Sequence, residues 1–203
     1  LILSWVTATY FFTKVFMHPK PSCSFYIALG LAIGIGLLSK YTMVVFIPGA
    51  LFLLYLKLGG TGPVLREKGV WIVSGLVLLL YAPNLYWNYS NGFASYMHTL
   101  ENASASTRVM PFVSYGLFQF TIYQFALLGP IIFSLLLFII FLMARKRYEM
   151  SSSQPEQLRY CLFILNLPLF LVICAVAFFS RAHANWAAPA YVGFLMLIVE
   201  WLI

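Results

Sequence analysis

The sequence predicts an all-α protein, a bundle of helices that cross a membrane. Of its 203 residues, 63% are hydrophobic and 8% are charged, and the mean hydropathy is +0.92. A soluble domain is about 25% charged and about 45–50% apolar, and no soluble globule of this length could bury so much apolar surface in one core. The composition therefore excludes a soluble enzyme, a disordered tail and a disulfide-stapled secreted domain, and it leaves a polytopic helical membrane protein.

Apolar runs separated by polar residues, Pro or Gly define the expected helices. Each run has about 15–20 residues, or roughly 23–30 Å of helix, against a hydrocarbon core of about 30 Å. The runs are 1–17, 24–39, 42–57, 70–86, 130–144, 160–179 and 188–203. We therefore expect about seven spans, which form a single membrane domain over residues 1–203. Because the chain opens and closes inside apolar runs, we also expect it to be a fragment of a larger protein.

The positions of Lys and Arg predict how the spans are oriented. If the run 1–17 ends on the cytoplasmic side and the runs alternate, nine of the 12 cations face the cytoplasm, as the positive-inside rule requires. The inside set is Lys14, Lys20, Lys57, Arg66, Lys68, Arg145, Lys146, Arg147 and Arg159; the outside set is Lys40, Arg108 and Arg181. The net charge of +7 then follows from topology and does not indicate nucleic-acid binding.

The segment 112–128 does not fit this alternation, and we expect it to form an interfacial helix on the outer face. A separate span here would move the Arg145–Arg147 cluster outside. Joined to 130–144, it would give a helix of roughly 50 Å, too long for one crossing. Its polar residues, Gln119, Thr121 and Gln124, suit an interfacial helix, and Gly129-Pro130 marks the bend into the next span.

Three smaller features are interpreted as structural. The cysteines Cys23, Cys161 and Cys174 lie in or beside apolar runs without metal-ligand or redox spacing, so we expect them to pack as small apolar residues. Gly30 and Gly34 form a small-xxx-small face, which indicates close helix packing within the chain. Glu200 lies in the last apolar run and would be costly if it faced lipid.

With this topology, three segments meet on the outer face: 39–41, 84–111 and 180–189. Together they carry Lys40, His98, Glu101, Arg108, Arg181 and His183, with several Asn, Trp and Tyr residues. The inner loops carry charge but little else. This convergence is the strongest functional signal in the composition and spacing of the sequence.

The cations of this face are candidate phosphate ligands. Lys40 occupies a turn too short to be a loop, at the edge of the hydrocarbon. It could simply snorkel to the interface, or it could bind a phosphate held at the membrane surface. Arg108 and Arg181 are similar candidates, since arginine can hold phosphate through two parallel hydrogen bonds; either could also be an exposed loop charge.

The same segments contain a weak candidate metal site. His98 and Glu101 are spaced i, i+3, which places both on one face of a helix. With His183 they could supply three ligands. The alternative is that each histidine is satisfied by hydrogen bonds in its own loop.

Four motifs occur in an order that resembles a known family. They are 34–41 (GIGLLSKY), 82–88 (APNLYWN), 91–95 (NGFAS) and 185–191 (NWAAPAY). They resemble the polytopic glycosyltransferases of the protein-mannosyltransferase and lipid A aminoarabinose-transferase group, family 39 and its bacterial relatives, which have the GT-C fold. The resemblance implies an inverting transferase in the cytoplasmic membrane of a bacterium. Such an enzyme moves a sugar from a polyprenyl-phosphate donor to a lipid or protein acceptor on the outer, periplasmic face.

The resemblance also implies roles for individual residues. Lys40 matches the family's lysine after the Gly-rich span, which is implicated in binding the lipid phosphate. His98 is similar to a histidine near the metal or donor site of the aminoarabinose transferases, where a divalent ion is a possible cofactor. Asn185 and Trp186 match the pattern of bacterial subfamilies.

The catalytic base of the family has no counterpart in this sequence. The family uses an aspartate near its N-terminus, after the first span, and this chain contains no aspartate. A hydroxyl acceptor benefits from a positioned carboxylate. We therefore expect the catalytic residue to lie upstream and the chain alone to be inactive.

Two other functions remain open from the sequence. A transporter or lipid-linked-sugar flippase would show paired repeats and ionisable residues within several spans; here Lys14 and Glu200 are the candidates, both near helix ends. A structural membrane subunit without a site is the other alternative.

Overall fold

The computed structural model describes residues 1–105, 115–145, 153–179 and 182–202, and every regular element in these residues is helical. The elements are α1 (Ile2–Met17), α2 (Cys23–Ser39), the 3-10 helix η1 (Tyr41–Val45), α3 (Phe46–Leu58), α4 (Thr61–Arg66), α5 (Lys68–Ser90), α6 (Ala94–Ala105), α7 (Tyr115–Leu128), α8 (Pro130–Arg145), α9 (Gln154–Phe179), the 3-10 helix η3 (Ala184–Ala187) and α10 (Ala188–Leu202). The prediction of an all-α helical bundle is confirmed.

Each of the seven predicted runs forms a helix, but the helices differ in length. Within the described residues, four helical stretches are long and apolar enough to cross a membrane by themselves: Tyr41–Leu58, Lys68–Ser90, Gln154–Phe179 and Ala184–Leu202. The helices α1 and α2 are apolar but have 16 and 17 residues. The pair α7 and α8 would count as one further, broken span.

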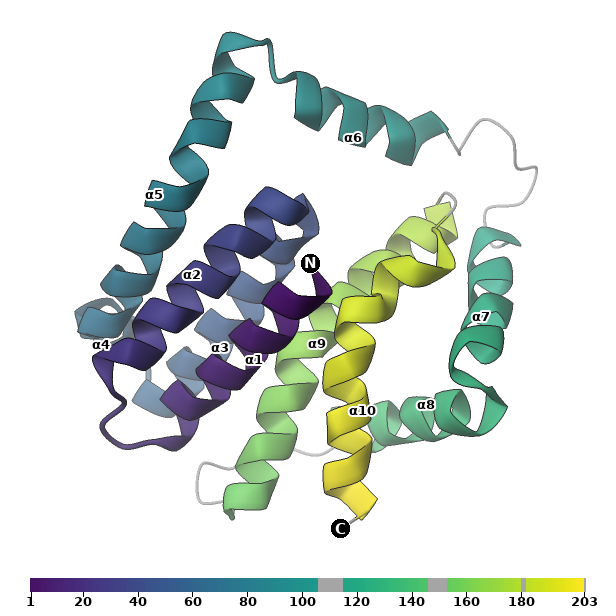
Figure 1. Cartoon of the computed structure of the whole chain (residues 1–203). Helices are drawn as coiled ribbons and strands as arrows, with labels where there is room; N and C mark the ends of the chain where they lie inside the picture. The colour runs from purple at the N-terminus through teal and green to yellow at the C-terminus, as the bar shows by residue number, and fades with distance from the viewer. Residues whose placement is uncertain (106–114, 146–152, 180–181, 203) are drawn as a thin grey trace.

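The bundle has two halves that share α1. Figure 1 shows α1, α2 and α5 in one half and α7, α9 and α10 in the other. The helix α1 contacts α2 on one side and both α9 and α10 on the other. Its buried face carries Trp5 and Phe12, which both pack edge-to-face on the buried Phe46 ring of α3. The core of the molecule therefore lies along α1.

A polar junction ties α1 to the second half of the bundle. Asn166 is fully buried in α9, and its Oδ1 accepts a hydrogen bond of 2.8 Å from Trp5 Nε1. Its Nδ2 donates to the Leu162 carbonyl at 2.6 Å. The absence of a side chain at Gly193 of α10 makes room for the Asn166 amide, since a Cβ there would lie 2.1 Å from Nδ2. Both polar atoms of the Asn166 amide thus have a partner, as a buried amide requires.

The predicted close packing of the Gly30–Gly34 face within the chain is confirmed. This face of α2 packs on α5, where a Cβ at Gly30 would lie 3.0 Å from the Leu76 Cβ. A Cβ at Gly34 would lie 2.6 Å from a Leu80 methyl group. Small residues let the two helices approach closely, which is the main source of attraction between helices in lipid.

The helices α7 and α8 form a pair with a sharp bend between them. The helix α7 packs along α9, and its buried Gln124 accepts a hydrogen bond of 2.6 Å from the Tyr191 hydroxyl of α10. The chain then turns by 116° at Gly129, which has φ +79°, and Pro130 starts α8 where no N–H is needed. The amide of Gln124 is therefore satisfied by a protein partner, whereas the interfacial position expected for 112–128 stays a prediction, and residues 112–114 lie outside the described part of the chain.

The helix α8, expected to span, crosses the bundle instead (Figure 1). Its last turn lines a pocket together with Arg159 at the start of α9 and Trp201 at the end of α10. Arg145 therefore lies at the same end of the bundle as Arg159. The predicted grouping of these two cations holds, although the helix that connects them to α7 runs differently.

The two ends of the bundle are named here after one lysine each. At the Lys40 end lie the α2–η1 junction, the α5–α6 corner and η3. At the Lys57 end, the Lys57 Nζ donates hydrogen bonds to the carbonyls of Val15 at 3.0 Å and His18 at 3.1 Å. These contacts satisfy carbonyl groups at the end of α1 that have no partner within the helix.

Candidate functional site

Two segments far apart in the sequence meet at the Lys40 end. Lys40 lies between α2 and η1, and Trp186 lies in η3. The Lys40 Nζ is 5.0 Å from the centroid of the Trp186 ring, within the ~6 Å range of a cation–π contact. The His183 ring is in turn 5.2 Å from the Trp186 ring. The structure thus joins three residues that the topology had placed on one face.

The local backbone holds both segments in place. Lys40 ends α2 in an extended conformation, with φ −162° and ψ 130°, and its N–H donates to the Gly36 carbonyl at 2.9 Å. The next residue already begins η1, so Lys40 sits in a junction without a loop. In η3, the Trp186 N–H donates to the His183 carbonyl at 3.0 Å. Pro189 follows in the first turn of α10, where a missing N–H costs no hydrogen bond.

The environment of the Lys40 ammonium favours an anionic ligand. Partial burial lowers the pKa of Lys40 from its ordinary value of 10.5, because desolvation disfavours the charged form. The face of the Trp186 ring stabilises the cation in part. A phosphate beside the ammonium would offset the remaining cost through a charge-assisted hydrogen bond.

A cluster of three tyrosines attaches α6 beside Lys40. The hydroxyl oxygens of Tyr81 in α5 and Tyr96 in α6 are 2.8 Å apart and share a hydrogen bond. The Tyr41 ring lies 4.9 Å from the Tyr96 ring and 6.4 Å from the Tyr81 ring. Because Tyr41 follows Lys40 directly, the cluster fixes the distance between α6 and the cation.

The corner between α5 and α6 is built around Asn88. This side chain is fully buried; its Nδ2 donates to the Asn84 carbonyl at 3.0 Å, and its Oδ1 accepts the Ser95 N–H at 3.2 Å. The second bond caps the start of α6. Gly92 and Phe93 have φ 62° and φ 58°, so the chain reverses its direction there. As a result α6 extends across the Lys40 end of the bundle (Figure 1).

Three residues of this region were not singled out from the sequence: Tyr81, Asn88 and Tyr96. Asn88 lies within the motif 82–88 and Tyr81 directly precedes it, so the motif carried a signal for both. For Tyr96 we find no such signal, since its hydroxyl partner is set by the fold.

The remaining predicted site residues fall into three groups. Asn185 is exposed beside Trp186. His98 and Glu101 are exposed on α6. Arg108 and Arg181 lie outside the described residues, so their predicted phosphate contacts stay untested.

The candidate metal site is not assembled by the structure. Among the residues that the structure describes, which include His98, Glu101 and His183, no group of three His, Cys, Asp or Glu side chains could hold a metal ion. The i, i+3 spacing places two candidates on α6, but η3 does not bring the third into the same group.

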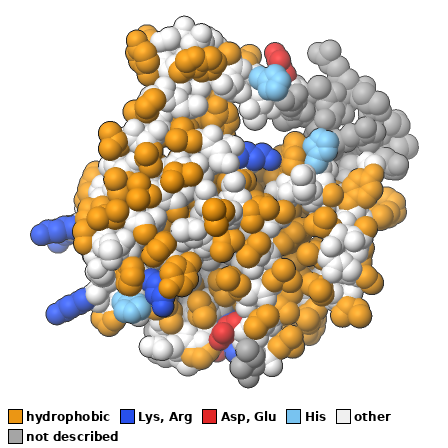
Figure 2. Space-filling view, viewed as in Figure 1, with side chains coloured by type: hydrophobic (Ala, Val, Ile, Leu, Met, Phe, Trp, Pro, Cys, Tyr) orange, Lys and Arg blue, Asp and Glu red, His pale blue; other side chains and the backbone are white. Residues whose placement is uncertain are grey.

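The surface at the Lys40 end is hollowed. Figure 2 shows a Lys or Arg side chain in a hollow between α6 and the rest of the bundle, with His side chains along its border. This side of the molecule otherwise presents mostly hydrophobic side chains (Figure 2). The hollow therefore contains a positively charged side chain.

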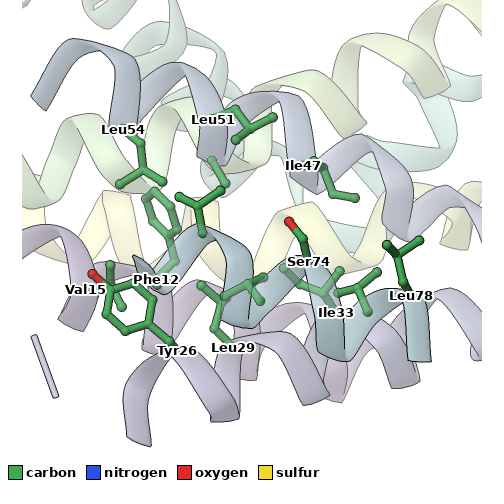
Figure 3. A pocket seen from close by; sticks show the side chains of 15 residues that line it. Phe12, Val15, Tyr26, Leu29, Ile33, Ile47, Leu51, Leu54, Ser74 and Leu78 are labelled. Carbon is green, nitrogen blue, oxygen red and sulfur yellow. The ribbon is translucent and has the colours of Figure 1, made fainter. Parts of the chain in front are cut away.

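A second feature lies deeper in the same half of the bundle. A cavity of about 310 Å³ is enclosed by α1, α2, α3 and α5 (Figure 3). Its lining is apolar apart from the side chains of Tyr26 and Ser74. Leu51 of α3 and Leu78 of α5 both line it and are 44% and 61% exposed. The cavity therefore opens to the surface between these two helices.

Comparisons with known proteins agree with the motifs. Residues 1–87 match the family model of dolichyl-phosphate-mannose-protein mannosyltransferases. The chain is also 31% identical, over 177 residues, to the lipid A galacturonosyltransferase RgtD of Rhizobium johnstonii. This alignment covers 87% of the chain and 35% of the relative, so the chain spans about a third of that protein's length. No solved structure matches the chain.

The family match includes the α2–η1 junction with Lys40 and most of α5. The apolar helices described above are those of a membrane protein. Together these findings confirm the resemblance that the four motifs predicted: the chain is similar to protein mannosyltransferases over residues 1–87 and to a lipid A glycosyltransferase over most of its length.

Proposed function

We propose that this chain forms the donor-phosphate half of a membrane glycosyltransferase site. The substrate is a sugar linked to a polyprenyl phosphate, and the acceptor is a lipid or protein. The observation that carries the proposal is the Lys40 ammonium over the Trp186 ring, partly desolvated at one end of an apolar bundle. A phosphate at the membrane surface is the anion that such a cation would meet.

The proposal places the Lys40 end on the outer face of the cytoplasmic membrane. The distribution of cations supports this orientation, since Lys14, Lys57, Arg145 and Arg159 gather at the opposite end. Cytoplasmic loops carry the excess of Lys and Arg in membrane proteins.

The reaction that follows is a displacement at the anomeric carbon of the donor. The acceptor hydroxyl attacks this carbon from the side opposite the phosphate, so the bond to the phosphate oxygen breaks and the configuration inverts. The hydroxyl proton passes to a carboxylate, and we expect the aspartate implied by the family resemblance, a residue type that this chain lacks, to accept it. Negative charge grows on the departing phosphate, and Lys40 is placed to stabilise it in the transition state.

The apolar cavity offers a place for the first isoprene units of the donor. Ile33 lines the cavity and is seven residues below Lys40 in α2, which is a rise of about 10 Å. A lipid phosphate at Lys40 would therefore stand above a cavity that opens sideways between α3 and α5. The chain of the lipid could enter through this opening without crossing polar surface.

The test measures binding of the departing group, because its identity does not depend on the sugar. The probe is a short-chain polyprenyl phosphate, titrated into the full-length protein in detergent, with Lys40→Ala, Lys40→Arg and Lys20→Ala as variants. Lys20 is exposed at the opposite end and serves as the control. We expect Lys40→Ala to weaken binding about 10–100-fold, because a hydrogen bond to a charged group contributes about 1.5–3 kcal/mol. Unchanged affinity would return Lys40 to a snorkelling role.

A further inference from the structure

A groove at the Lys57 end lies outside the proposed transferase site. It is about 630 Å³ in volume and lies between α1 and α10, with Leu158 and Leu162 of α9 as its floor. Figure 1 shows these two helices diverging toward this end. Its upper walls are apolar, with Val6 of α1 facing Val192 of α10. The shape and lining suit an alkyl chain that enters from the bilayer.

A buried hydroxyl on the wall of the groove lacks a protein partner. Thr9 lines the groove and is 3% exposed. Among the residues that the structure describes, its Oγ1 is the one buried side-chain oxygen or nitrogen that has no hydrogen-bond partner. Its neighbour Thr13 is satisfied differently, since that hydroxyl donates to the Tyr10 carbonyl at 2.7 Å. A ligand atom that accepts a hydrogen bond inside the groove would complete the pattern.

The mouth of the groove carries one cation and one carboxylate. Lys14 of α1 lines it on one side, and its Nζ lies 5.4 Å from the centroid of the Tyr10 ring. Glu200 of α10 lines it on the other side. The backbone carbonyl of Glu200 accepts a hydrogen bond of 3.1 Å from Arg159 Nε. His18, the third polar residue here, is oriented by the 2.9 Å contact between its Nδ1 and the Lys14 carbonyl. The mouth thus offers opposite charges on opposite walls.

We propose that this groove binds a phospholipid with an aminoethyl phosphate headgroup, that is, phosphatidylethanolamine. Lys14 binds the phosphate, Glu200 binds the primary ammonium, and Thr9 donates its hydroxyl to an ester carbonyl. The order fits the molecule, since Thr9 lies five residues, or about 7.5 Å of helix rise, deeper than Lys14. The acyl chain then continues along the apolar walls.

The charges select this lipid over the other common headgroups. Phosphatidylglycerol has a phosphate for Lys14 but no ammonium, so the Glu200 carboxylate would gain no cationic partner from it. Phosphatidylcholine has a cation without an N–H donor, so it cannot donate a hydrogen bond to the carboxylate. The groove is separate from the Lys40 site, and lipid binding here does not depend on the transfer reaction.

The experiment compares the three lipids on the full-length protein. Delipidated protein is mixed with equimolar phosphatidylethanolamine, phosphatidylglycerol and phosphatidylcholine in detergent, and native mass spectrometry counts the bound lipids. We expect phosphatidylethanolamine to bind about tenfold more tightly than either competitor, since one charge-assisted hydrogen bond is worth about that factor. Glu200→Gln should abolish the preference over phosphatidylglycerol, and Thr9→Val should weaken all three lipids.

Matched variants separate a specific site from general attraction. Lys14→Ala should reduce phosphatidylethanolamine binding at least fivefold, whereas Lys20→Ala, exposed at the same end, should not. Equal effects of the two substitutions would overturn the proposal. Equal binding of the three lipids to the wild-type protein would also overturn the proposal. So would the absence of any bound lipid, which is the result expected if another protein segment fills the groove.

Discussion

The substitution Gly193→Ala tests the polar junction between α1, α9 and α10. A Cβ at this position would lie 2.1 Å from Asn166 Nδ2, 2.4 Å from Cγ and 2.5 Å from Oδ1. The amide must move, and it then loses its hydrogen bonds with Trp5 Nε1 and the Leu162 carbonyl. Each of these bonds is worth about 1–2 kcal/mol in a membrane interior, and overpacking adds about 1–3 kcal/mol. We expect a loss of about 3–7 kcal/mol in the free energy of unfolding.

The assay is unfolding of the full-length protein in mixed micelles by titration with SDS, followed by tryptophan fluorescence and circular dichroism. Gly75→Ala is the matched control, because a Cβ there meets no atom within 4 Å. That substitution should leave stability unchanged or raise it by about 0.5–1 kcal/mol, since alanine favours a helix over glycine.

A double-mutant cycle shows whether the clash acts through the amide. In an Asn166→Ala background the Cβ at position 193 has room, so Gly193→Ala should cost little there. The reasoning is refuted if Gly193→Ala matches Gly75→Ala in the parent protein. It is also refuted if the cost is the same in both backgrounds.

Three further predictions concern the Lys40 end. The affinity for a polyprenyl phosphate should fall as pH rises through the pKa of Lys40, which burial lowers below 10.5. Lys40→Arg should remove this loss of affinity, because a guanidinium stays charged. The same loss in both proteins would contradict the role assigned to Lys40. Tyr96→Phe removes the hydrogen bond between the Tyr96 and Tyr81 hydroxyls and should speed amide hydrogen exchange in α6. The control is Tyr89→Phe, at a side chain that is 74% exposed, and it should leave the exchange rates unchanged. Identical exchange in both variants would show that this hydrogen bond does not hold α6. Ile47→Trp should fill the apolar cavity and weaken the binding of polyprenyl phosphate about tenfold, but not the binding of inorganic phosphate. Val44 lies outside the cavity lining and is 52% exposed. An equal effect of Val44→Trp would argue against a lipid tail in the cavity.

Local patterns in the sequence were enough to predict much of the bundle. Apolar runs and their punctuation located the helices, because helix length and hydrophobicity are set by the bilayer and depend little on tertiary contacts. The Gly30–Gly34 spacing predicted a close helix contact, although not that α5 is the partner. The alternation of the spans predicted that Lys40 and Trp186 lie at one end of the bundle, and the structure brings their side chains into contact.

What the sequence could not predict depends on long-range polar contacts. The amide of Gln124 was taken as a sign of an interface, but its partner Tyr191 is 67 residues away. The partner of Asn166 is 161 residues away, in Trp5. A polar residue in an apolar run is equally compatible with water and with a buried partner, and only the fold decides between them. The packing of α7 against α9 and α10 depends on such a partner.

The contacts of Lys57 imply that one lysine serves at two stages in the life of the protein. In the orientation that we propose, its charge counts toward retention on the cytoplasmic side while the chain enters the bilayer, as the positive-inside rule describes. Once α1 and α3 have docked, the same ammonium is engaged by the Val15 and His18 carbonyls. A signal for insertion thus becomes part of the folded joint between two helices. Two of the three N–H donors of its ammonium are then engaged within the protein.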